Sequence, residues 1–171
     1  GVQTCALPIL PWRRAAAIMR DAAMGLAHAH EQGIIHRDLK PENIMLARRP
    51  KPSRQVVKVL DFGLAKLMHE AGAPLPDASI TRTGVVFGTP EYMSPEQAEG
   101  TTLDHRTDVY ALGVIGYQMI VGDVPFSAPT FLALITKAVQ DDPVPPSVRR
   151  PDAEIPAELE ALILRCLAKK P

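Results

Sequence analysis

The sequence has few features of secreted, nucleic-acid-binding or membrane-spanning proteins. Its 171 residues hold two cysteines, Cys5 and Cys166, in no metal-ligand spacing, which argues against a disulfide framework and suits a reducing compartment. Nineteen basic and nineteen acidic side chains cancel, so we expect no nucleic-acid partner and no membrane contact. The most apolar run, residues 109–121, is too short to span a bilayer. The start lacks a basic region, so no signal peptide is predicted and a cytoplasmic location is expected.

The first nine residues look foreign to the rest of the chain. Residues 1–9 resemble the conceptual translation of a widely used sequencing adapter, so we expect an artefact there and native sequence from about Leu10. The alternative is an ordinary apolar loop. At the other end, Pro171 closely follows an apolar helical pattern, and we expect the native protein to continue beyond it.

Hydrophobic periodicity predicts a mainly helical domain. Residues 11–32 have apolar side chains at helical spacing, and Gly33 is placed to end that helix. Residues 106–121 are apolar nearly all round, as in a core helix. A surface turn is predicted over 48–54, and an aperiodic loop over 64–92 has a length typical of functional loops. The predicted elements are helices 11–32, 106–121, 130–140 and 157–168 and strands 34–36, 43–46 and 56–60.

Two polar motifs carry the chemistry. One loop holds a carboxylate, an ammonium and an amide in the run His36-Arg37-Asp38-Leu39-Lys40-Pro41-Glu42-Asn43. A second carboxylate follows an apolar strand in Asp61-Phe62-Gly63. Transfer of a phosphoryl group from a nucleotide needs a base for the incoming hydroxyl, cations for the phosphate charge and oxygen ligands for hard metal ions. The two motifs together supply all of these groups.

These motifs resemble the H-R-D-L-x-x-x-N and D-F-G motifs of the protein kinase family. A third motif, Gly88-Thr89-Pro90-Glu91-Tyr92-Met93-Ser94-Pro95-Glu96, is similar to the family's substrate-docking segment, with Ser94 in place of the usual alanine. The resemblance implies an α+β, protein kinase-like fold. Residues 10–171 would form a partial domain, a mainly α-helical C-terminal lobe with short strands around the catalytic loop. The N-terminal lobe, with its Gly-rich loop, lysine and glutamate, is absent from this sequence.

The resemblance assigns catalytic and cofactor-binding roles. Asp38 is expected to act as the catalytic base or to orient the substrate hydroxyl, and Lys40 to reach the transferring phosphate. Lysine at this position marks serine/threonine kinases within the family. Asn43 and Asp61 are expected to bind Mg²⁺ bridging to the phosphates of ATP. Met45 would lie below the adenine ring, although a methionine at strand spacing is more often a core residue.

The resemblance also assigns structural and regulatory roles. His36 is expected to pack beneath Phe62 and not to act in catalysis. Arg37 could pair with a phosphate in the long loop, where Thr81 and Thr83 lie at positions phosphorylated in related bacterial kinases, with Ser79 nearby. These loop hydroxyls could equally be ordinary surface residues.

Three further residues are assigned by the resemblance. Thr89 is expected to contact the catalytic loop, and Glu96 to pair with an arginine beyond Pro171. Asp108 is expected to hold the catalytic-loop backbone through hydrogen bonds. As the first acid of a helix, Asp108 is also favoured by the helix dipole.

The function expected from these features is transfer of the ATP γ-phosphate to serine or threonine hydroxyls of protein substrates, with ATP and Mg²⁺ as cofactors. Since half of the nucleotide site is missing, the chain by itself is expected to be inactive or nearly so. Two alternatives stay open: a pseudokinase-like binding or scaffold module, and a small-molecule phosphotransferase with a related Asp and Asn loop. The sequence leaves open whether the parent protein is anchored to a membrane by another segment.

Overall fold

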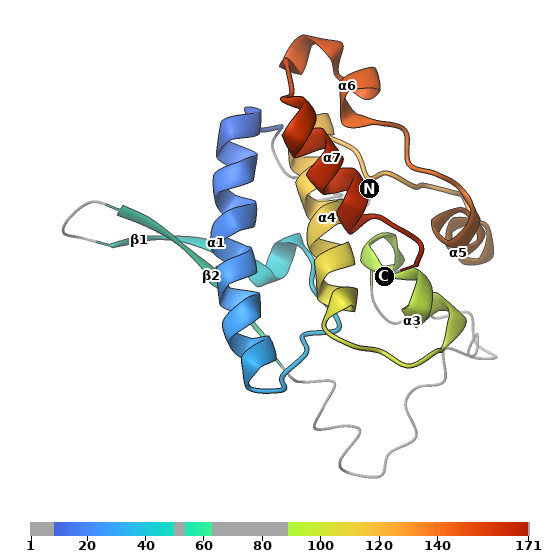
Figure 1. The fold of residues 1–171 in the computed structure, drawn as a ribbon, viewed down its shortest axis with the longest axis horizontal. Coiled ribbons are helices and arrows are strands. Elements are labelled where there is room, and N and C mark those ends of the chain that lie inside the picture. Colours follow the sequence, from blue (N-terminus) through green and yellow to red (C-terminus); the bar gives the residue numbers. More distant parts are fainter. Residues whose placement is uncertain (1–8, 50–53, 63–88, 171) are drawn as a thin grey trace, which may run out of the picture.

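Three helices form the centre of the molecule. The computed structural model describes residues 9–49, 54–62 and 89–170, with the side chains of 48, 49 and 54 left out. Helix α4 (Arg106–Val121) contacts both α1 (Trp12–Glu31) and α7 (Ala157–Cys166), and Figure 1 shows it between them. The large hydrophobic cluster of the domain is built around this central helix.

Helix α4 is buried along its length, as the all-round apolar pattern predicts. Every residue of α4 is buried except Arg106, Val109 and Gln118. Burial of a large apolar side chain contributes about 1.5–3 kcal/mol, so this helix is the main anchor of the domain. It ends at Gly122, whose φ of 92° lies in the left-handed region that favours glycine.

Helix α1 buries the face that its sequence spacing predicts. The buried residues on it are Ala15, Ile18, Met19, Ala22 and Leu26. Gly33 lies just past the end of this helix with a φ of 70°, and its N–H donates to the carbonyl oxygen of His30 (2.9 Å). The predicted role of Gly33 in ending the helix is confirmed.

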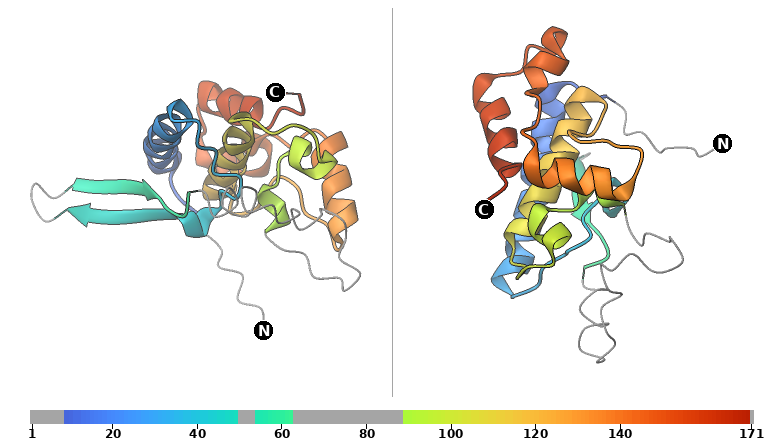
Figure 2. Two further views of the ribbon diagram at one scale, coloured as in Figure 1. Left: turned by 90° about the horizontal axis from the view of Figure 1, so that it is seen from below. Right: turned by 90° about the vertical axis from the view of Figure 1, so that its right-hand side faces the viewer.

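The described sheet is a two-stranded antiparallel hairpin. Strand β1 (Ile44–Arg49) pairs with β2 (Arg54–Val59), in register from Ile44 opposite Val59 to Arg49 opposite Arg54. The strands are longer than the sequence predicts, because the predicted turn over 48–54 contributes residues at both ends to the ladder. Strand β2 contacts α1, and the hairpin projects from the helical body (Figures 1 and 2).

The predicted strand over 34–36 is wrong. No strand pairs with this segment in the described part of the chain. The Ile34 N–H donates to the Ala29 carbonyl oxygen (3.0 Å), which turns the segment back onto the end of α1. The His36 N–H donates to a carboxylate on α4 instead of to a neighbouring strand (2.8 Å). Apolar residues at this position therefore connect the helix to the polar loop without forming a strand.

Two further helices of ten residues each follow α4 along the chain. The predicted amphipathic helices are confirmed as α5 (Phe131–Gln140), whose first turn is capped by Thr130, and α7, which ends two residues before the predicted boundary. Most of the long loop predicted over 64–92 lies outside the described residues, but its last part forms a 3-10 helix.

No helix in the described ranges is long and apolar enough to cross a membrane. The shorter elements are α3 (Pro95–Glu99), α6 (Pro146–Arg149) and the 3-10 helices Pro41–Asn43, Pro90–Tyr92 and Pro151–Ala153.

The close packing of α4 on α7 predicts that Gly113 cannot accept a side chain. A Cβ added there would lie 2.6 Å from the Cβ of Cys166, whereas a Cβ added at Gly25 of α1 would lie 3.7 Å from Val59. Overpacking costs about 1–3 kcal/mol, and an unstrained Gly→Ala change within a helix gains up to about 1 kcal/mol. In urea titrations Gly113→Ala is expected to lower the free energy of unfolding, and Gly25→Ala to leave it equal or higher. Equal stability of the two variants would contradict this packing.

Candidate active site

The polar loop after α1 is held by one buried carboxylate. Asp108, in the first turn of α4, is fully buried. Its Oδ2 accepts a hydrogen bond from the His36 backbone N–H (2.8 Å) and its Oδ1 accepts one from the Arg37 backbone N–H (2.9 Å). The Nε2 of His30 lies 2.7 Å from the same Oδ2. The predicted hold of Asp108 on the loop backbone is therefore present, with His30 as a partner that the sequence pattern did not indicate.

Two residues at the site, Arg37 and Asp61, have backbone conformations that are uncommon for residues with a side chain. Arg37 has a φ of 67°, in the left-handed region, and Asp61, two residues after β2, has a φ of 60°. A residue with a Cβ pays roughly 1–2 kcal/mol there, so the surrounding contacts must hold it in place. Both strained residues stand directly beside or within the predicted catalytic positions.

Asp38 and Lys40 form a solvent-accessible ion pair. The Nζ of Lys40 lies 2.9 Å from Oδ2 of Asp38, and the two side chains are 25% and 56% exposed. The ion pair places both side chains on the same side of the loop. An exposed pair of this kind contributes at most about 1 kcal/mol to stability. The ammonium can consequently exchange its carboxylate partner for a phosphate at little cost.

Asn43 is buried behind this pair. Its Nδ2 donates to the backbone carbonyl oxygen of Asp38 (3.2 Å), which leaves the amide oxygen as the atom available to a ligand. The Leu60 N–H donates to the Asn43 carbonyl oxygen (2.8 Å) and so brings the end of β2 beside the loop. Asp61 follows immediately and is exposed. The structure therefore brings the loops that carry the two predicted metal ligands together.

His36 has a structural position. Its Nε2 lies 2.8 Å from the Leu60 carbonyl oxygen, and its ring meets the Phe62 ring at a centroid distance of 5.0 Å and an angle of 62°. The histidine is 2% exposed. Its packing against Phe62 is as predicted, and its contact with Leu60 also links the polar loop to the end of β2.

Met45 lies on β1 opposite Lys58 and is 42% exposed. It is therefore not a core residue in this structure, unlike most methionines at strand spacing. The exposed thioether stands two residues past Asn43, on the strand that leaves the polar loop. In this position the Met45 side chain is accessible for the predicted contact with the adenine ring of ATP.

The predicted substrate-docking motif lies partly within the described residues. Thr89 precedes the 3-10 helix Pro90–Tyr92, and its predicted contact with the catalytic loop stays a prediction. Glu96 lies on α3 and accepts a hydrogen bond from the Thr107 hydroxyl (2.8 Å). The predicted regulatory residues Thr81 and Thr83, like Ser79 and Gly63, lie outside the described residues. The pairing of Arg37 with a phosphate in that loop therefore stays a prediction as well.

Burial makes the tyrosine of this motif harder to ionise. Desolvation, with the nearby Glu42 carboxylate, raises the pKa of Tyr92 to about 12. The phenol, protonated at neutral pH, donates to Oε1 of Gln118 on α4 (2.7 Å). This bond fastens the motif to the central helix.

Ligand-binding atoms near the loop are mostly oxygen. In the described ranges no group of three or more His, Cys, Asp or Glu side chains is placed to hold a metal ion. A metal at Asn43 and Asp61 would have to complete its coordination with other oxygens, such as phosphates and water. Magnesium binds in this way, with few protein ligands.

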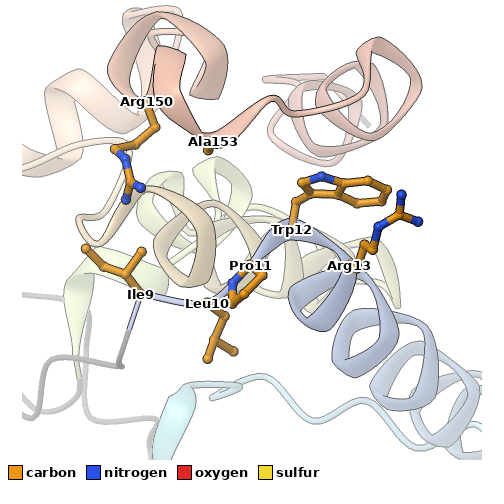
Figure 3. A pocket seen from close by; sticks show the side chains of 7 residues that line it. All are labelled: Ile9, Leu10, Pro11, Trp12, Arg13, Arg150 and Ala153. Carbon is orange, nitrogen blue, oxygen red and sulfur yellow. The ribbon is translucent and has the colours of Figure 1, made fainter.

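Two cavities lie apart from the loop. One of about 440 Å³ lies between α1, α4 and α7 and is mostly apolar, with Cys166 in its wall, and burial raises the pKa of that thiol. Neither cavity is lined by a residue of the runs 36–43 or 61–63, so neither forms part of the candidate site around Asp38. The other, of about 460 Å³, has Arg150 and Ala153 on one side and the start of α1 on the other (Figure 3); its lining is Ile9, Leu10, Pro11, Trp12, Arg13, Arg150 and Ala153.

The hydrogen bonds of Asp108 predict a large effect of Asp108→Asn. An amide in place of the carboxylate puts an NH₂ group against a backbone N–H and weakens bonds worth about 1.5–3 kcal/mol each. We expect Asp108→Asn to lower the free energy of unfolding by about 2–4 kcal/mol in urea titrations.

The matched control is Asp104→Asn, four residues earlier. Hydrogen bonds from Arg106 lower the pKa of Asp104 to about 2. Because both side chains of this pair are exposed, 48% and 43%, solvent screens it and the expected loss is below about 1 kcal/mol. Similar losses for Asp104→Asn and Asp108→Asn would contradict the special role of the buried carboxylate.

Comparison with known proteins shows the family of this chain. Residues 7–171 match the protein kinase domain. The chain is 50% identical over 159 residues to the serine/threonine-protein kinase pkn3 of Myxococcus xanthus, covering 92% of this chain and 28% of the relative. It is 44% identical over 164 residues to the serine/threonine-protein kinase PknB of Mycolicibacterium smegmatis, covering 96% of this chain and 24% of the relative. The chain thus spans about a quarter of the length of these curated relatives, and it belongs to the protein kinase domain family.

Proposed function

We propose that the protein transfers the γ-phosphate of ATP to serine or threonine hydroxyls of protein substrates. The observation that carries the proposal is the loop held by Asp108, which presents the Asp38–Lys40 pair beside Asn43 and the end of β2. The relatives named as serine/threonine-protein kinases support the same reaction.

Asp38 would act on the substrate hydroxyl. The hydroxyl oxygen forms a bond to the γ-phosphorus as the bond from that phosphorus to the β,γ-bridging oxygen breaks. The hydroxyl proton passes to the Asp38 carboxylate, and ADP leaves. Lys40, which already contacts this carboxylate at 2.9 Å, lies where its charge can offset the negative charge on the transferring phosphoryl group.

Asn43 and Asp61 would hold magnesium with the nucleotide. Their amide and carboxylate oxygens are the donors that this hard cation prefers. When bound, Mg²⁺ supplies charge neutralisation on the phosphates. The exposed Met45 would lie against the adenine.

The alternative functions have less support. A binding or scaffold module would not need Asp38, Lys40, Asn43 and Asp61 to remain together in one site. A small-molecule phosphotransferase would not need the motif from Thr89 to Glu96, which stands beside the loop and fits a polypeptide substrate.

The proposed activity belongs to the full-length protein. We propose that residues 10–171 are the C-terminal lobe and that residues 1–9 are foreign, so the chain alone would show little turnover. A cytoplasmic kinase domain is consistent with Cys166, which is a free thiol in the described part of the chain. Phosphorylation of Thr81 or Thr83 would give Arg37 an anionic partner.

One prediction of the proposed function concerns Asp38 in the full-length protein. Asp38→Asn is expected to lower kcat for transfer of radiolabelled phosphate from ATP to a protein substrate by about 10²–10⁴-fold, because the proton acceptor is lost. The melting temperature should not fall, since Asp38 is largely exposed. Asp21→Asn, an acid of α1 paired with Arg20, is the matched control with unchanged kcat. A wild-type protein that phosphorylates an aminoglycoside but no protein, or an active Asp38→Asn variant, would refute the proposal.

Another prediction of the proposed function concerns the binding of Mg²⁺ by Asp61. Asp61→Asn is expected to raise the Mg²⁺ concentration needed for half-maximal activity on the order of tenfold or more, since one of two protein ligands loses its charge. Asp123→Asn removes an exposed acid near Arg149 and should leave the magnesium dependence as it is. Identical magnesium titrations for wild type and Asp61→Asn would exclude Asp61 as a ligand.

A further inference from the structure

Gln97 connects two segments that are far apart in sequence. It lies on α3, directly after Glu96 of the docking motif. Its Nε2 donates to the Arg37 backbone carbonyl oxygen (2.7 Å), and its Oε1 accepts from the Ser94 backbone N–H (3.1 Å). Because a carbonyl can only accept and a backbone N–H can only donate, the two partners fix the orientation of the amide. Neither a carboxylate nor an ammonium can make both bonds.

The two hydrogen bonds of the Gln97 side chain form a bridge between the docking motif and the loop. At the docking-motif end, this bridge is held by further hydrogen bonds. Ser94 is fully buried and forms a capping box with Gln97, in which the Ser94 Oγ accepts from the Gln97 N–H (3.4 Å). The Ser94 hydroxyl also lies 3.4 Å from Oγ1 of Thr107, which in turn donates to Glu96. The serine that replaces the family's usual alanine therefore ties the start of α3 to α4.

The loop end of the bridge is the strained residue beside Asp38. Arg37 has a φ of 67°, and its N–H is held by Asp108. Its carbonyl belongs to the peptide group that leads into Asp38, and this carbonyl is what Gln97 holds. Two contacts from separate segments thus fix Arg37, and the contact from Gln97 sets the tilt of the peptide plane that carries Asp38.

We propose that Gln97 is a positioning residue that couples the substrate-docking motif to the catalytic aspartate. The inference rests on the proposed kinase function and deepens it. The docking motif and Asp38 must be placed together for a substrate hydroxyl to meet the base, and displacements of about 1 Å can cost on the order of 100-fold in rate. Gln97 provides a direct link for this alignment without touching nucleotide or substrate itself.

The test uses two substitutions in the full-length protein, each of which removes one function of the Gln97 amide: the donor to the Arg37 carbonyl or the acceptor for the Ser94 N–H. Gln97→Glu keeps an oxygen for Ser94 but places a carboxylate oxygen against the Arg37 carbonyl. Gln97→Lys keeps a donor for that carbonyl but cannot accept from Ser94. We expect Gln97→Glu to lower kcat by about tenfold or more, with the KM for ATP changed less than about twofold, because the base is misplaced while the nucleotide site is intact. Gln97→Lys should lose less of kcat than Gln97→Glu.

A matched control accounts for the change of charge. Gln140→Glu makes the same substitution at the exposed end of α5, and its kcat and melting temperature should equal those of wild type. The proposal is overturned if Gln97→Glu keeps the wild-type kcat. It is also overturned if Gln97→Lys is the less active variant, or if kcat falls only in proportion to the fraction of unfolded protein.

A spectroscopic signal tests the contact without any assay of activity. Arginine labelled with ¹³C at the carbonyl and aspartate labelled with ¹⁵N give one signal for each Arg–Asp peptide, and this chain has two, Arg37–Asp38 and Arg20–Asp21. In Gln97→Glu the carbonyl resonance of Arg37 should move, and that of Arg20 should stay. An unmoved Arg37 resonance would show that Gln97 does not bond to the Arg37 carbonyl, and it would overturn the proposal. An inactive wild type would instead refute the kinase function, and the resonance would then decide the contact by itself.

Discussion

The buried carboxylate of Asp108 is the constraint on which the rest of the site depends. It is fully enclosed at the start of the central helix, where an ionised group is costly unless hydrogen bonds satisfy it. Two consecutive backbone N–H groups, of His36 and Arg37, provide those bonds. The loop is therefore fixed to the most deeply packed element of the domain. Asp38 and Lys40 can remain exposed and loosely paired, because the rigidity of the site comes from the core beneath them.

Much of this arrangement could be predicted from the sequence, since its signals are local. The all-round apolar pattern of α4 and the spacing on α1 follow directly from helical geometry, and Gly33 follows from the need for a left-handed residue after a helix. The catalytic motifs have fixed offsets, so the side-chain types at Asp38, Lys40 and Asn43 are enough to indicate phosphoryl transfer. Their resemblance to one family also predicts the contact of Asp108 with the loop.

The features that could not be predicted depend on contacts between distant segments. The run Ile34-Ile35-His36 resembles a strand by local pattern, but the His36 N–H donates to Asp108, 72 residues away, instead of to a neighbouring strand. The link from His30 to Asp108 spans 78 residues, and that from Gln97 to Arg37 spans 60. The spacing Ser94-x-x-Gln97 matches a capping box, so the bond of Gln97 to Ser94 has a local signal, whereas its bond to Arg37 has none.

The polar loop that carries Asp38 is held on the hydrophobic core through the buried Asp108 carboxylate. The most direct test is residue-resolved hydrogen exchange of the His36 and Arg37 backbone amides in the full-length protein, compared with core amides of α4 such as that of Ile115. We predict that both loop amides exchange as slowly as the core amides and open only with them, because their bonds end on a buried carboxylate. Exchange as fast as that of exposed loop amides, with α4 still protected, would contradict the claim.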